Sequence, residues 1–233
     1  MSFEFLSTSE AAPARSPMER EARAAGAVFE RRDGWNVAVR FEDPQAERER
    51  CRAAVGFADL SQLGKIELQG ELAAFAGGGA LELGTALRSD GAWWCPYTRE
   101  RALVLCEAAS TAGLRERLEE AAESSPGLAS VIDLSSSLGA LAIAGPGARE
   151  TFARFTAIDL RPQVTPVGGF RPGSVARSAG AILREGEERY LMLFGAALGR
   201  YMWTVVADAA AALGGGPVGV DALDPVGQAA VHA

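Results

Sequence analysis

Histidine is nearly missing from this sequence, and its scarcity argues against two large classes of reaction. The 233 residues contain one histidine, His232, next to the last residue. A Ser-His-Asp or Cys-His site needs an imidazole held on an ordered element, whereas chain termini fray. The three cysteines, at positions 51, 95 and 106, have no CxxC spacing. We therefore expect no histidine-dependent nucleophile, no metal site and no disulfide framework.

Lysine and long apolar runs are also scarce. Lys65 is the only lysine, and the formal net charge is −7. A general nucleic-acid binder needs a basic surface that displaces counterions from phosphates, so we expect no nucleic-acid partner. The longest apolar stretch, residues 205–220, is interrupted by Asp208, three glycines and Pro217, and is therefore not expected to span a membrane. Residues 1–15 lack the pattern of a signal peptide, so we predict a cytoplasmic protein.

Glycine is plentiful, but its arrangement argues against a nucleotide cofactor. Gly168-Gly169 and Gly214-Gly215-Gly216 follow neither the P-loop pattern nor a GxGxxG pattern in a βαβ unit. We expect no nucleotide or flavin site.

The most informative feature is an internal repeat. Residues 57–61, Phe-Ala-Asp-Leu-Ser, recur as Val-Ile-Asp-Leu-Ser at 131–135, and residues 63–70 recur at 138–145. A helical pattern follows each copy, and a short apolar strand and an amphipathic helix come after it. These later pairs are residues 101–105 with 111–122, and residues 189–193 with 197–213.

The order of strand, helix, strands and helix in each copy is that of a ferredoxin-like unit. We therefore predict an α+β fold that arose by duplication, with residues 57–130 and 131–213 as its two copies. Because Asp59 and Asp133 both precede Leu-Ser, they are expected to occupy equivalent positions.

Two further helices are predicted before the repeat. Ser16-Pro17 and Asp43-Pro44 each combine a capping residue with a first-turn proline, and they precede helices expected at 18–25 and 45–54. The residues between these helices are expected to be extended around a turn at Asp33-Gly34. Residues 162–173, rich in proline and glycine, are predicted to form a loop before a strand at 174–183.

Several segments, taken in order, resemble one known family. Gly26-Ala27, Gly34-Trp35, residues 55–61, Leu63-Gly64 and Gly70 look like the N-terminal half of the glycine cleavage T-protein, a tetrahydrofolate-dependent aminomethyltransferase. The similarity continues through 141–148, 189–206 and 216–223, so that it covers most of residues 16–224. Related domains occur in dimethylglycine dehydrogenase, in subunits of heterotetrameric sarcosine oxidase, and in folate-binding proteins linked to iron–sulfur maintenance.

The resemblance implies two interlocked ferredoxin-like lobes with folate in the channel between them. Residues 1–56 with 131–233 are expected to form the first lobe, and residues 57–130 the second. In the family a C-terminal barrel follows, and this sequence stops before one could begin. The resemblance therefore implies tetrahydrofolate or a related small molecule as ligand, and a protein partner in place of the barrel.

The catalytic carboxylate of the family has no counterpart in this sequence. Residues 89–97 align with the family's catalytic segment, and Trp94-Cys95 stand where the acidic pair is expected. A carboxylate positions the folate nitrogen and supports a developing iminium charge, which an indole or a neutral thiol does much less well. Asp90 would need a shifted loop to take this role. We expect no catalytic residue, and hence a degenerate site.

Four residues are predicted to contact a ligand. Trp94 and Tyr97 offer flat aromatic faces suited to a pterin ring. Arg177 matches an arginine of the family and could pair with the glutamate tail of folate. The carboxylate that grips the pterin in the family falls at Glu187 or Glu188, and we assign it to Glu188.

Two functions remain open from the sequence. The first is a T-protein-like folate-binding protein, related to aminomethyltransferases, with a degenerate catalytic site. The alternative is a non-catalytic interaction subunit of a sarcosine oxidase-like or other flavoprotein complex. Strand alternation leaves open whether Trp93 or Trp94 faces the channel. A tryptophan that points inward would narrow the channel, so we expect weak or absent folate binding.

Overall fold

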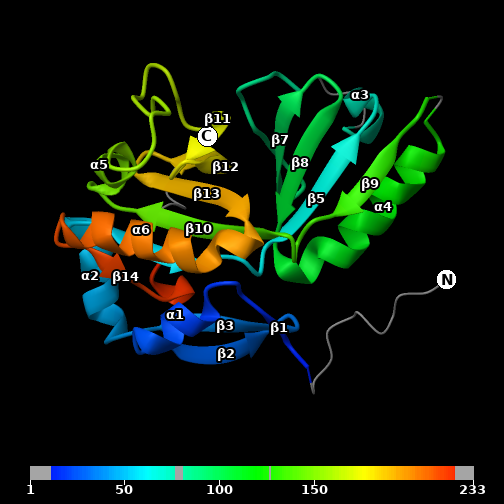
Figure 1. Cartoon of the computed structure of the whole chain (residues 1–233). Coiled ribbons are helices and arrows are strands. Elements are labelled where there is room, and N and C mark those ends of the chain that lie inside the picture. Colours follow the sequence, from blue (N-terminus) through cyan, green and yellow to red (C-terminus); the bar gives the residue numbers. More distant parts are fainter. Residues whose placement is uncertain (1–11, 77–80, 126, 224–233) are drawn as a thin grey trace.

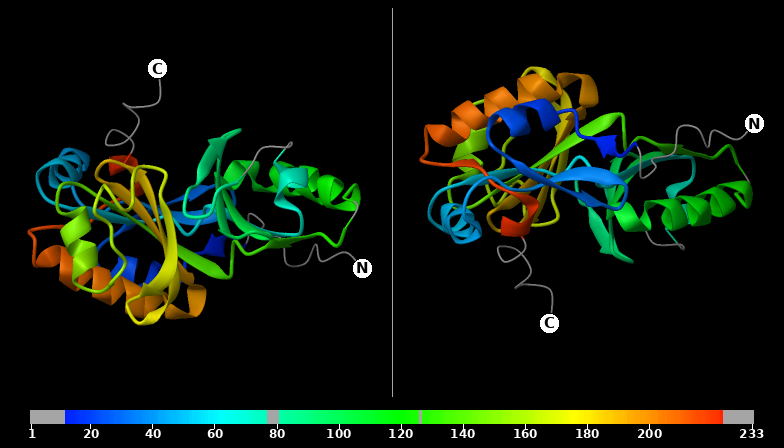
Figure 2. Two further views of the ribbon diagram at one scale, coloured as in Figure 1. Left: turned by 90° about the horizontal axis from the view of Figure 1, so that it is seen from above. Right: turned by 90° about the horizontal axis from the view of Figure 1, so that it is seen from below.

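The chain forms two lobes that lie side by side, with a smaller sheet beneath one of them (Figures 1 and 2). This computed structural model describes residues 12–76, 81–125 and 127–223. Each lobe has a β-sheet with helices on its outer face, so the predicted α+β class is confirmed. Among the described residues, no helix combines the length and the apolarity needed to cross a membrane.

The six-stranded lobe is the larger one. Its sheet has the strand order β11-β12-β13-β10-β4-β14, and helices α5 and α6 cover it. The strands in chain order are β4 (Gly56–Asp59), β10 (Leu138–Ala144), β11 (Phe170–Val175), β12 (Ser178–Gly186), β13 (Arg189–Gly195) and β14 (Gly216–Pro217). The helices are α5 (Ala148–Ala153) and α6 (Gly199–Ala211), and short 3₁₀ turns occupy Ala196–Leu198 and Val220–Ala222.

The five-stranded lobe has the strand order β6-β7-β8-β5-β9 and carries helices α3 and α4. Its strands are β5 (Gly64–Gln69), β6 (Leu87–Ser89), β7 (Ala92–Thr98), β8 (Arg101–Cys106) and β9 (Ser130–Asp133). Its helices are α3 (Leu72–Phe75) and α4 (Thr111–Glu123), the latter preceded by a 3₁₀ turn at Ala108–Ser110.

The third sheet has the order β1-β3-β2 and lies below the six-stranded lobe with helices α1 and α2 (Figure 1). Its strands are β1 (Ala14–Arg15), β2 (Val28–Arg32) and β3 (Trp35–Arg40), and the helices are α1 (Glu19–Ala24) and α2 (Pro44–Ala53). Asp33 and Gly34 have φ values of 49° and 79°, which suit the tight turn of a hairpin. Asp43 caps α2 by accepting from the N–H groups of Gln45 and Ala46.

The two large sheets exchange one strand each. Although β4 and β5 follow each other in the chain, β4 pairs with β10 in the six-stranded sheet. Similarly, β9 precedes β10 but pairs with β5 in the five-stranded sheet. The runs β12-β13-β10-β4 and β7-β8-β5-β9 therefore have the same arrangement, each completed by a strand that crosses from the other lobe.

The two Asp-Leu-Ser segments lie where these strands cross, and their hydrogen bonds mirror each other. Asp59 Oδ1 accepts the N–H of Ser61 at 3.0 Å, and Asp133 Oδ1 accepts that of Ser135 at 2.9 Å. Ser61 Oγ in turn accepts the N–H of Ala140 at 3.2 Å, and Ser135 Oγ accepts that of Lys65 at 3.0 Å. Each serine thus links its own segment by a hydrogen bond to the strand that follows the other segment in the chain, β10 for Ser61 and β5 for Ser135.

Three apolar cores follow from the alternation of side chains along the strands. One lies between the six-stranded sheet and α1, α5 and α6, and includes Phe57, Phe152 and Trp203. Another lies under α3 and α4. The third, which we call the interlobe core, contains residues from the facing sides of both large sheets and includes Cys95, Leu103, Leu183 and Leu191.

Two local expectations need correction. The segment predicted as a loop at 162–173 already becomes strand β11 at Phe170, whose side chain is buried. Pro172 is tolerated there because β11 is an edge strand, where a missing N–H costs no ladder bond. Helix α1 is present as predicted, but Ser16 does not occupy its N-cap. The Ser16 hydroxyl accepts the N–H of Met18 and donates to Asp59.

Candidate functional site

Strand β7 settles which tryptophan faces the other lobe. Trp93, Cys95 and Tyr97 project toward the six-stranded sheet and pack against the interlobe core. Trp94, on the opposite face, is 6% exposed and packs under α3 and α4. Trp94 is therefore a core residue of the five-stranded lobe, and Trp93 and Tyr97 are the aromatic residues on its inner face.

The space between the two sheets is packed with side chains at its centre. Cys95, Leu183 and Leu191 are completely buried there. Backbone hydrogen bonds close one edge, because the Ala86 N–H donates to Gly168 O at 2.7 Å and the Phe170 N–H donates to Gly84 O at 3.0 Å. The inner faces thus form a shared core over the part where the family's channel was expected.

Glu67, which the sequence analysis did not single out, is a carboxylate on the inner face. It lies on β5, is 8% exposed, and accepts hydrogen bonds from the Tyr97 hydroxyl, from Arg101 Nη2 at 2.7 Å and from Gln69 Nε2 at 2.6 Å. Burial alone would raise the pKa of Glu67, but these three donors outweigh it and lower the pKa. The alternation of polar and apolar residues from Lys65 to Gln69 is the signal that could have identified it.

Tyr97 is consequently engaged rather than free. Burial raises the pKa of the Tyr97 hydroxyl, and the hydrogen bond to the Glu67 carboxylate raises it further. Arg101 lies 5.2 Å from the centre of the Tyr97 ring and bonds the same carboxylate. The cluster can therefore hold a hydrogen-bonding ligand only by giving up contacts that it already makes.

Lys65 is a second buried charged group, at the crossing of the lobes. Its side chain has no exposed surface, and Nζ donates to the carbonyl oxygens of Ser61 at 2.9 Å and Leu63 at 2.5 Å. Burial lowers the pKa of Lys65 to about 8, against the opposing effect of Asp59 and Asp133. Burial raises the pKa of Asp59, while hydrogen bonds from Ser16 and Ser61 partly offset that change.

Arg177 and Glu188 lie at opposite ends of β12. Arg177 is exposed in the turn before β12, with φ of 63°, and Glu188 is exposed in the turn after it. A strand of this length spans roughly 30 Å. Together with the position of Trp94, this means that the four predicted ligand residues do not form one site in this structure. Arg171, another arginine of this lobe, donates to the carbonyl oxygens of Gly84, Phe170 and Val164.

Asp90 does not lie where the family's carboxylate is needed. It occupies the β6–β7 turn with φ of 50° and is exposed. With Trp94 and Arg117 it lines a small cavity of about 110 Å³ beneath α4, on the face opposite to the interlobe core. A shifted loop is therefore not present to supply the acid.

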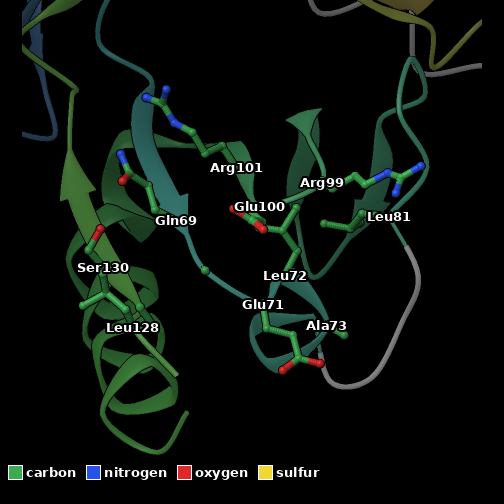
Figure 3. A pocket seen from close by; sticks show the side chains of 12 residues that line it. Gln69, Glu71, Leu72, Ala73, Leu81, Arg99, Glu100, Arg101, Leu128 and Ser130 are labelled. Atoms are coloured by element: carbon green, nitrogen blue, oxygen red, sulfur yellow. The ribbon is translucent and has the colours of Figure 1, made fainter. Parts of the chain in front are cut away.

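A larger open cavity, of about 840 Å³, lies at the tip of the five-stranded lobe (Figure 3). Leu72 and Leu81 lie near its middle, while the guanidinium groups of Arg99 and Arg101 extend in different directions. None of the four predicted ligand residues lines it. In the described part of the chain, no group of three or more His, Cys, Asp or Glu side chains is placed to hold a metal ion. His232 lies outside that part.

Comparison with known proteins places this fold among two related groups. The profile of the sarcosine oxidase, gamma subunit family matches residues 80–212. An aminomethyltransferase of Saccharopolyspora erythraea is 27% identical over 232 residues, which cover 91% of this chain and 62% of the relative. An aminomethyltransferase of Picosynechococcus is 40% identical over 57 residues, or 24% of this chain and 16% of that protein. This chain thus spans about three fifths of the length of the first of these relatives.

Solved structures give the same picture of the fold. The glycine cleavage system aminomethyltransferase T of Bartonella henselae superposes with a TM-score of 0.74 at 19% identity, covering 91% of this chain and 61% of that one. A chain of the heterotetrameric sarcosine oxidase of Corynebacterium sp. U-96 superposes with a TM-score of 0.66 at 21% identity. That match covers 86% of this chain and 96% of the other.

Proposed function

Because this chain belongs to the sarcosine oxidase, gamma subunit family, we propose that it is a non-catalytic subunit of a sarcosine oxidase-like complex. The observation that carries the proposal is the interlobe core, which fills the space where a related aminomethyltransferase would be expected to bind its ligand. The near-complete overlap with one chain of a heterotetrameric enzyme supports the same role. The partner is a flavoprotein subunit, and a cytoplasmic location is part of the proposal.

The relationship to aminomethyltransferases is clear from the comparisons, but we propose that their activity is lost here. Cys95 is completely buried in the interlobe core, and Trp94 points to the other side of the sheet. Neither residue can stabilise a developing positive charge between the lobes as a carboxylate would. The chain therefore contributes structure to its complex rather than catalysis.

A residual folate site is the second candidate, and one observation favours it. Glu67, Tyr97 and Arg101 form a polar cluster on the inner face, and the Arg101 side chain is 46% exposed. Such a cluster offers an aromatic face together with a carboxylate, the combination that recognises a pterin-like ring. Tetrahydrofolate or a related molecule would bind weakly, because existing hydrogen bonds must open first.

We also propose that the two lobes arose by duplication as interlocked ferredoxin-like units. The matching strand orders and the mirrored hydrogen bonds of the two Asp-Leu-Ser segments support this origin. In this proposal residues 1–56 with 131–233 make the first lobe and residues 57–130 the second, and β4 and β9 are the strands exchanged at the boundaries.

Co-expression tests the proposed role directly. The chain is produced with the other subunits of the sarcosine oxidase-like complex of its own organism, and the mixture is analysed by size-exclusion chromatography with mass determination. We expect one species that contains this chain in fixed stoichiometry and oxidises sarcosine. In parallel, calorimetry of the isolated chain with 5-formyltetrahydrofolate measures the second candidate. A chain that stays alone and binds the folate tightly would reverse the order of the two candidates.

A further inference from the structure

Strand β9 has a free edge, whereas its counterpart in the other lobe does not. The five-stranded sheet ends at β9, and no further strand pairs with it among residues 12–76, 81–125 and 127–223. In the six-stranded sheet, β4 occupies the position that corresponds to β9, and β14 lies beyond it. The added strand is therefore the difference between a five-stranded and a six-stranded sheet.

The register shows which backbone groups of β9 face this edge. Leu134 N–H donates to Lys65 O at 2.7 Å. In the antiparallel pairing of β9 with β5, successive residues alternate between positions that are hydrogen-bonded to β5 and positions that are not. Ile132 and Ser130 consequently bond to β5. The N–H and C=O groups of Val131 and Asp133 point away from β5, toward the free edge.

The six-stranded lobe shows how such an edge is used. On β4, the corresponding outward residue is Phe57, whose carbonyl oxygen accepts the N–H of Val218 at 2.9 Å. Gly216 N–H donates to Val55 O at 3.1 Å, and Gly216-Pro217 runs parallel to β4. Phe57 and Val131 occupy the same place in the repeat, two residues before Asp59 and Asp133.

The surroundings of β9 leave this edge suited to another strand. Helix α4 packs on one face of the sheet through Leu114 and Leu118, and its Arg115 forms an ion pair with Asp133 at 3.7 Å. Edge strands are protected by short length, charged side chains, proline or a bulge. Strand β9 is four residues long, ends in Asp133 and has no lysine or proline. Strand β4 is equally short and also ends in an aspartate, yet it pairs with β14. Ile132 is 41% exposed and Leu128, just before β9, is 96% exposed.

From this geometry we infer that an extended segment of a partner subunit adds to β9 as a sixth strand, parallel to it. The inference rests on the proposed role of the chain as a subunit. The partner's N–H groups donate to the carbonyl oxygens of Ala129 and Val131, as Gly216 and Val218 do to Val55 and Phe57. Small or β-branched apolar residues in that segment would cover Ile132 and Leu128. In the six-stranded lobe, residues 216–218 (Gly-Pro-Val) of the same chain occupy the corresponding edge.

The test uses the co-expressed complex and two variants of one residue. The Val131 N–H points toward the free edge, where it can donate to a carbonyl oxygen of the added strand. Val131→Pro therefore removes one hydrogen bond to the partner and none to β5. Val131→Ala is the matched control, since it loses side-chain packing but keeps the N–H. We expect the proline variant to bind the partner subunits about tenfold more weakly than the alanine variant. Thermal melting of both isolated variants checks that each is folded.

Hydrogen exchange at single-residue level provides a second measurement on the unaltered chain. On complex formation, exchange of the Val131 and Asp133 amides is expected to slow by about tenfold or more. The Ile132 amide, already bonded to β5, should change little, so neighbouring residues act as internal controls. Because it uses the unaltered chain, this measurement also tests whether a strand adds to β9 if Val131→Pro does not fold.

The outcomes separate the inference from the proposed function. If the complex forms, but both variants bind equally and exchange at Val131 is unchanged, the inference is wrong and the proposed function stands. If the isolated chain dimerises and Val131→Pro abolishes the dimer, the occupant is a second copy and the inference is wrong. If no complex forms with the unaltered chain, the proposed function and the inference fail together.

Discussion

Lys65 shows at the scale of one residue how burial makes stability depend on pH. The pKa of its ammonium group falls from the ordinary 10.5 to about 8 in the folded chain, chiefly through burial. Between these two values the unfolded chain binds the proton and the folded chain does not. The free energy of unfolding should therefore rise with pH across this window, by up to about 3 kcal/mol.

Comparison with Lys65→Met isolates this effect. The variant loses two hydrogen bonds but has no titrating group at this position, so the contribution from Lys65 disappears. Burial raises the pKa of the Cys51 thiol to about 11, which acts in the opposite direction but equally in both proteins. Urea unfolding from pH 7 to 10.5 gives the difference curve. A difference that stays constant over this range would contradict the prediction.

The tryptophan pair supports a second prediction at this scale. Trp94→Ala should destabilise the chain by about 3–5 kcal/mol, because it empties part of the core under α4. It should not create folate binding, since Trp94 faces away from the interlobe core. Trp93→Ala is the matched variant on the inner face. Urea unfolding and calorimetry with 5-formyltetrahydrofolate measure both effects, and folate affinity that appears only in Trp94→Ala would show that this side chain blocks a channel.

These residues also show where sequence reasoning ends. Alternation along β7 predicts that the two tryptophans face opposite sides, but local sequence does not say which side meets the other sheet. That choice depends on the register of β7 against β8, in which Trp93 lies opposite Leu105 and Trp94 opposite Val104. Glu67 was missed because its partners Tyr97 and Arg101 are distant in sequence and meet it only through the pairing of β5, β7 and β8.

At the scale of elements, the serines of the two Asp-Leu-Ser segments should differ in their contribution to stability. Ser61 is 1% exposed, so Ser61→Ala leaves the Ala140 N–H buried without a partner and should cost about 1–3 kcal/mol. Ser135 is half-buried, and water can replace its hydroxyl, so Ser135→Ala should cost about 1 kcal/mol or less. Urea unfolding of the two single variants tests the order. A larger loss at Ser135 would contradict it.

The elements themselves were largely predictable, but their pairing was not. Helices α2, α4 and α6 begin and end close to the predicted residues, because capping residues and apolar periodicity act locally. The exchange of β4 and β9 between sheets is a non-local property, because it depends on which distant strands, β10 and β5, they pair with. Residues 170–173 of β11 were predicted as the end of a loop because they contain proline and glycine, but the edge position of β11 accommodates both in a strand.

At the scale of the whole molecule, the order of repeated segments and the family resemblance indicate the two-lobed α+β fold. Neither the repeat nor the resemblance indicates that side chains fill the space between the lobes. That property depends on the volumes of side chains brought together from both sheets, among them Leu103, Leu183 and Leu191. A family pattern preserves the backbone path, whereas a few substitutions on facing strands decide whether a channel remains open.

The last prediction follows from this packed arrangement. The isolated chain should convert no aminomethyl donor and tetrahydrofolate to methylenetetrahydrofolate and ammonia above the rate without protein. Trp94 and Cys95 supply no carboxylate, and Asp90 lies on the outer side of the sheet. Absorbance and ammonia assays measure both products, with Asp90→Asn and Glu67→Gln as companion variants. Turnover abolished by Asp90→Asn would reveal a rearranged loop, and turnover abolished by Glu67→Gln would assign the acid to the inner face. Equal background rates in all three proteins are expected, because a positive charge developing between the lobes has no preorganised carboxylate free to receive it.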